Sequence, residues 1–127
     1  MPDPEIEAFA RIIVRHIRDA AIRSNDAALR DDVSHAVGRR WREAASKGDP
    51  KELARVLIPD IVDDTVFYLL NAIDQGILQL SFTAPNGKTA ELHEDGRGEL
   101  GGWYMGSDGW RASYSEERVV DDFSDLK

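Results

Sequence analysis

The sequence predicts a single α+β domain, in which a helical N-terminal half packs on a small antiparallel sheet of three to four strands that is followed by a C-terminal helix. Apolar residues recur with a helical period before about residue 76, whereas short alternating runs separated by turn signals follow it. The length of 127 residues suits one domain, and 42% apolar and 31% charged residues are typical of a folded protein. We expect helices over about 4–76, a sheet over about 77–114 and a helix over about 115–126.

Two helices are expected before residue 48. The first begins at Pro4, because proline suits the first turn and Asp3 can cap it. One side of this helix is apolar and carries Ile6, Phe9, Ala10, Ile13, Ile17 and Ala20. The second helix is predicted to begin near "SND" at 24–26 and to end at Lys47, since Gly48 follows as a stop signal.

Two further helices are expected between residues 49 and 76. Asp49 and Glu52 have the spacing of a capping box, which predicts a short third helix over 50–58. A fourth helix is predicted to begin at Pro59 and to end before Gly76. Its apolar residues cover a wide arc, so we expect it to be the central helix of the core.

The apolar period changes to two in the next segment, "ILQLSFT", which predicts a strand. Asn86 and Gly87 tolerate the positive φ of tight turns, so "APNGK" predicts a β-hairpin. The segment "GGWYMGSDGWRASY" over 101–114 predicts a second pair of short strands at one edge of the sheet. Ser115 is then a cap for the final helix.

Charge is divided unevenly along the chain. Residues 1–58 hold 11 Lys/Arg and 10 Asp/Glu, whereas residues 59–127 hold 5 and 14, so the second half has a net charge of −9 and the whole chain −8. Such a surface repels nucleic-acid phosphates and acidic lipid headgroups, so we expect a basic protein partner and neither nucleic acid nor membrane. The sequence has no cysteine and no long apolar stretch in its first thirty residues, which favours a cytoplasmic location.

Carboxylates and one aromatic ring gather on the fourth helix. Asp60, Asp64, Phe67 and Asp74 share one side of it, within about 80° on a helical wheel. One interpretation is a strip that binds a basic partner, with Phe67 as an anchor. The other is that these residues stabilise the fold, with Asp60, Asp63 and Asp64 complementing the N-terminal dipole of the helix and Phe67 packing under a neighbouring element. A divalent metal site is the weakest interpretation, because one helix lacks the turn geometry and extra oxygen ligands of calcium sites.

A second candidate surface is the glycine-rich segment that holds Trp103, Tyr104, Trp110 and Arg111. The rings either fill one face of the sheet against the helices, or one tryptophan is presented beside Tyr104 and Arg111 as an interaction hot spot. A concave pocket for a small ligand is a third possibility, and the sequence leaves open which tryptophan is exposed.

The run "GRGELG" over 96–101 matches the dinucleotide fingerprint G-x-G-x-x-G. We interpret the match as accidental, because "GWYMGSDG" follows and is not expected to form the helix whose N-terminus would hold a pyrophosphate.

We therefore expect a non-catalytic module, without cofactor or metal, that binds a basic protein as inhibitor or immunity proteins do, an analogy of composition only. The expected contact residues are Phe67, Asp60, Asp64, Asp74, Trp103, Tyr104, Trp110 and Arg111. One alternative is a small metal-assisted hydrolase or ligand-binding protein that uses Asp60, Asp63 and Asp64 with His93. Another is a subunit of a homo-oligomer whose aromatic hairpin is buried in a symmetric interface.

Overall fold

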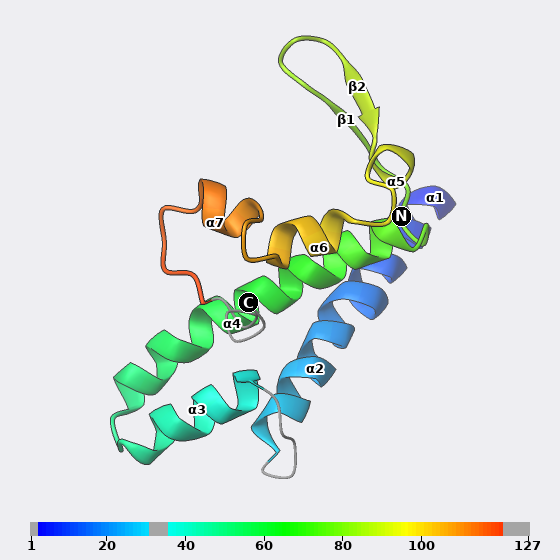
Figure 1. Cartoon of the computed structure of the whole chain (residues 1–127). Helices are drawn as coiled ribbons and strands as arrows, with labels where there is room; N and C mark the ends of the chain where they lie inside the picture. Colours follow the sequence, from blue (N-terminus) through cyan, green and yellow to red (C-terminus); the bar gives the residue numbers. More distant parts are fainter. Residues whose placement is uncertain (1–2, 31–35, 121–127) are drawn as a thin grey trace.

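The computed structural model describes residues 3–30 and 36–120 and is mostly helical (Figure 1). A continuous helix opens it, composed of α1 (Pro4–Ile12), the π-helical segment η1 (Ile13–Arg18) and α2 (Asp19–Leu29). No glycine or proline interrupts this stretch after its first residue, so the helix does not end where a new one was expected to begin near residue 24. The predicted start of a second helix at that point is wrong.

The next two helices are α3 (Ala36–Ser46) and α4 (Pro50–Asp74), and they are joined by a tight turn. Gly48 has a positive φ of 76°, which confirms the predicted stop. The side chain of Asp49 accepts a hydrogen bond from the backbone N–H of Lys51 at 3.0 Å, so the predicted start of the following helix is also confirmed.

Helix α4 passes through Pro59, so the separate third and fourth helices of the prediction are one element of 25 residues. A proline inside a helix has no N–H to donate to the carbonyl four residues earlier, which here is that of Arg55. The guanidinium of Arg118 donates to this carbonyl instead, through Nε at 3.3 Å and Nη2 at 3.0 Å. Arg118, which follows α7 (Trp110–Tyr114), thereby attaches this part of the chain to α4 at the carbonyl of Arg55, which the proline leaves without an intrahelical donor.

A β-hairpin follows α4, with strands β1 (Ser81–Thr83) and β2 (Thr89–Glu91) paired antiparallel. Gly87 in the turn has a φ of 83°, as the turn chemistry predicts. The hairpin projects from the helices (Figure 1) and is the whole sheet of the described residues, so the predicted three to four strands are wrong.

Three short helices follow the hairpin: α5 (Leu92–Asp95), α6 (Leu100–Met105) and α7 (Trp110–Tyr114). The last two replace the second pair of strands predicted over 101–114, which is therefore wrong. A helix near the C-terminal end is therefore present as α7, although it begins before Ser115. Residues 115–120 are not helical, and the rest of the predicted final helix, 121–126, lies outside the described residues.

Helix α4 is central, since it contacts η1, α2, α3, α5 and α6. The buried apolar side chains of the main core are Ile17, Ala72, Ile73, Leu78 and Leu100. Figure 1 shows α2 on one side of α4 and α6 on the other. Within residues 3–30 and 36–120, every helix is too short or too polar to span a bilayer.

Candidate functional site

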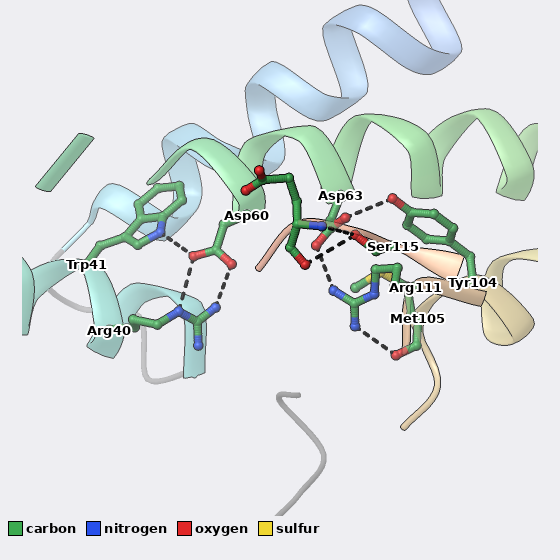
Figure 2. A network of polar contacts seen from close by, with 9 residues as sticks. Arg40, Trp41, Asp60, Asp63, Tyr104, Met105, Arg111 and Ser115 are labelled. Carbon is green, nitrogen blue, oxygen red and sulfur yellow. Dashed lines mark hydrogen bonds and ion pairs between the residues drawn. The ribbon is translucent and has the colours of Figure 1, made fainter. Parts of the chain in front are cut away.

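The carboxylates of α4 hold the neighbouring helices in place, and Asp60 makes the contact to α3 (Figure 2). Asp60 accepts hydrogen bonds from Nε and Nη2 of Arg40, at 3.2 and 2.7 Å, and from the indole N–H of Trp41 at 2.7 Å. Its side chain is only 7% exposed. The negative charge of Asp60 is therefore neutralised within the protein, because a bidentate arginine and an indole N–H compensate the cost of burying the carboxylate.

Asp63 makes the equivalent contact to α6 and α7 (Figure 2). It accepts from Nη1 of Arg111 at 2.6 Å and from the hydroxyl of Tyr104 at 2.8 Å. The Arg111 side chain is 7% exposed, and its Nη2 donates to the carbonyl of Met105 at 3.0 Å. One carboxylate thus fixes two short helices that have little core of their own.

Burial raises the pKa of Tyr104 to about 12, and the hydrogen bond and negative charge of Asp63 act in the same direction. The guanidinium of Arg111 opposes this rise, and it lies 5.8 Å from the centre of the Tyr104 ring. Tyr104 is therefore a neutral hydrogen-bond donor to Asp63 at physiological pH.

Asp74 caps helix α6 from the end of α4. Its two carboxylate oxygens accept from the backbone N–H groups of Leu100 and Gly101, each at 2.9 Å. A Cβ on Gly101 would lie 2.9 Å from a ring carbon of Phe67, so the glycine is required for the close contact between the two helices. Phe67 accordingly packs under α6, as one of its two interpretations expected.

The expectation that residues after "GRGELG" form no helix is wrong, because α6 begins at Leu100. The interpretation of the motif as accidental is consistent with its surroundings. A helical turn, α5, and not a strand, precedes the glycines, and the N-terminus of α6 already binds the carboxylate of Asp74. The place of a phosphate is therefore taken by a side chain of the same protein.

Asp64 points toward α2, where it accepts from Nδ2 of Asn25 at 3.1 Å. A cavity of about 80 Å³ lies next to this contact, with polar lining from Asn25, Asp60, Asp63, Asp64 and Arg111. Nε of Arg111 is buried and has no hydrogen-bond partner among the described residues. A cavity of this size and polarity suits a few water molecules rather than a substrate.

The structure does not bring His93 to the three aspartates. Nδ1 of His93 lies 2.9 Å from the carbonyl oxygen of Ile73, ten residues along α4 from Asp63 and hence about 15 Å away along the helix axis. In the described ranges, no group of three or more His, Asp or Glu side chains could hold a metal ion. The geometry therefore gives no support to the metal-assisted hydrolase.

Aromatic side chains of α6 and α7 surround an open groove of about 450 Å³, which we call the aromatic groove. It is lined by Asp63, Tyr104, Trp110, Arg111, Tyr114, Ser115, Arg118 and Val119. Trp103 is not one of the lining residues, but its ring centre lies 6.1 Å from that of Trp110, which is. Trp110 packs against the core, whereas Trp103 is 39% exposed, which answers the question that the sequence left open.

The expected contact residues therefore fall into two groups. Asp60, Asp64, Asp74 and Phe67 make contacts within the protein only. Tyr104, Trp110 and Arg111 line the aromatic groove, where Tyr104 and Arg111 also bond Asp63, and Trp103 contacts the ring of Trp110. Sequence reasoning missed Tyr114, which is 78% exposed. Its signal was an aromatic residue between serines, "SYS", directly after the tryptophan-rich segment. In comparisons with known proteins, no family model, no curated protein and no solved structure matches this chain.

Proposed function

We propose that this protein is a non-catalytic module that binds a basic protein partner through the aromatic groove. The observation that carries the proposal is the exposure of Tyr114 and Trp103 on helices that buried polar contacts tie to α4. Tryptophan and tyrosine dominate interface hot spots, because they offer a large contact area at a small entropic cost. Helices that are already fixed lose little further freedom on binding.

Charge favours a basic partner at this groove. Exposed acidic side chains flank the aromatic residues in the sequence, at Asp108 between α6 and α7 and at Glu116 and Glu117 after α7. Arg118 at the groove is compensated by Glu117 at 3.0 Å and by the carbonyl of Arg55. Exposed acidic groups near the groove residues in the sequence would attract a basic surface and speed its approach, while the rings supply the buried area.

The carboxylates of α4 contribute indirectly in this proposal. Asp63 and Asp74 hold α6 and α7 in the orientation that presents the rings, and Asp60 holds α3. We therefore assign positioning roles to these aspartates and contact roles to Trp103, Tyr104, Trp110 and Tyr114.

Affinity capture from a native lysate tests the proposal, at about 0.05 M and about 0.5 M salt. The wild type is expected to capture a basic protein at the lower concentration and much less at the higher. With that protein purified, Tyr114→Ala and Trp103→Ala should each raise Kd about 30-fold, the effect of removing a hot spot. Phe82→Ala is the matched control, because Phe82 is an aromatic residue on the hairpin whose exposure, 56%, lies between those of Trp103 and Tyr114.

The expected control result is an unchanged Kd for Phe82→Ala. If Tyr114→Ala binds the partner with the same Kd as Phe82→Ala, the aromatic groove is not part of the interface and the proposal is wrong. Capture of an acidic protein, or capture that is insensitive to salt, would contradict the predicted charge of the partner.

A further inference from the structure

A second groove lies on the other side of α4, between that helix and the η1–α2 stretch. It has a volume of about 450 Å³, and we call it the helix groove. Ile17 and Ala21 form its floor, Arg18, Ile22 and Asp26 its outer wall, and Ile61 of α4 the opposite wall. Ile61 lies two residues from Asp63, and so about 200° around α4, which places the helix groove and the aromatic groove on different faces.

Apolar side chains in this groove, and others on the same helices, are exposed to solvent. Ile22 is 43% exposed and Leu29, two turns further along, is 61% exposed. Val14 before them and Ile58 and Ile61 on α4 are also exposed. Together they form a strip in which apolar side chains alternate with Arg18 and Asp26, and exposed apolar side chains gathered in this way are typical of a protein interface.

We propose that two copies of this chain associate by packing their η1–α2 helices antiparallel along the helix groove. Exposed side chains at intervals of about one turn along η1 and α2 alternate in character: Val14 is apolar, Arg18 positive, Ile22 apolar, Asp26 negative and Leu29 apolar. An axis of two-fold symmetry at Ile22 places Arg18 opposite Asp26 of the partner subunit and Val14 within one residue of the level of Leu29 of the partner subunit. Each contact then occurs twice, as two-fold symmetry requires.

The charges of Arg18 and Asp26 favour a second copy of the chain as the partner, and they favour the antiparallel over the parallel orientation of the two helices. A parallel pair would place Arg18 against its own copy, and the repulsion would disfavour it. A purely basic partner would meet Arg18 and a purely acidic one Asp26, whereas a second copy in the antiparallel direction satisfies both. Arg18 already contacts Asp19 at 2.9 Å, but both side chains are well exposed, and such surface pairs are weak enough to rearrange.

The strip is long enough for a specific contact. Val14 to Leu29 spans fifteen residues, or about 23 Å of helix. Ile58 and Ile61 widen it on the α4 side, toward the roughly 800 Å² per subunit that standard interfaces bury. This inference is independent of the proposed function, since it uses the opposite face of α4.

Sedimentation equilibrium with the full chain tests the proposal through charge reversal. The wild type should form a dimer, and Arg18→Asp or Asp26→Arg alone should raise its Kd about tenfold, because each change replaces two attractive contacts by two repulsive ones. The double variant Arg18→Asp/Asp26→Arg should restore the wild-type Kd. Arg23→Asp makes the same charge change on another side of the helix and should leave Kd unchanged.

A cysteine at the proposed axis gives a second measurement. The chain has no cysteine, so Ile22→Cys creates a single thiol that should form an intermolecular disulfide rapidly under mild oxidation. Arg23→Cys, one residue away, should do so much more slowly. A wild type that stays monomeric up to about 0.2 mM, well above the micromolar Kd typical of weak specific dimers, would overturn the proposal. So would a double variant that does not recover, or equal oxidation rates for the two cysteine variants.

Discussion

Substitution of Asp63 by asparagine should reveal how much of the structure depends on one carboxylate. The substitution keeps the shape of the side chain but leaves the guanidinium of Arg111 buried without its counter-ion, since that pair is joined at 2.6 Å and both partners are largely buried. Removing one member of such a pair costs about 3–5 kcal/mol. The total stability of a domain is about 5–15 kcal/mol, so the loss should lower Tm by about 10–20 °C.

Urea unfolding followed by circular dichroism provides the free energy of unfolding. Arg55→Gln is the matched control, because it breaks an ion pair to Glu52 whose partners are both more than 60% exposed, and no measurable loss is expected. The double variant Asp63→Leu/Arg111→Met removes both charges and should regain most of the stability. If Asp63→Asn is as stable as Arg55→Gln, the pair does not hold α6 and α7 and the positioning role of Asp63 is wrong.

Two further predictions concern the same helices. Tyr104 keeps its proton up to about pH 12 in the folded protein but loses it near pH 10 when unfolded, so its stabilising contribution is complete below pH 10 and disappears as the pH rises through 12. In urea unfolding across that range, Tyr104→Phe should lose less stability than the wild type. Gly101→Ala should destabilise the protein by about 1–3 kcal/mol, because its Cβ would press on the ring of Phe67 in α4. Gly102→Ala is the control, since its Cβ would meet no atom within 4 Å, and it should be neutral or stabilising in the same assay.

Local signals in the sequence were sufficient where a few adjacent residues determine the backbone. Asp49 caps a helix through its own side chain, and Gly48 and Gly76 end helices with positive φ. The turn of the hairpin likewise depends on Asn86 and Gly87 alone. The helix continues to Leu29 because no glycine or proline between Pro4 and that residue breaks it, and the polar "SND" at 24–26 is not by itself enough to start a new helix.

Distant contacts decided the rest. Glycine has a low helix propensity, so "LGGWYM" gave no helical signal, and α6 forms because Asp74, 26 residues earlier, satisfies its first N–H groups. Pro59 resembled a helix start, yet α4 continues through it, and Arg118 donates to the carbonyl of Arg55 that the proline leaves without an intrahelical donor. Neither pairing has a signature in local spacing, and both determine where the candidate site lies.

The acidity of the second half of the chain therefore has two separate roles. Asp60 is largely buried and paired with the half-buried Arg40, and Asp63 is paired with the buried Arg111, so their charges are largely cancelled and little affected by salt. The carboxylates that can attract a partner are the exposed ones, such as Glu99, Asp108 and Glu116. Reversal of charge at these exposed positions should slow association with a basic partner and weaken its salt dependence, whereas reversal at Asp63 should reduce binding by displacing the rings themselves. The two roles can thus be distinguished by whether a variant changes the rate of association at low salt or the folded structure that presents the aromatic groove.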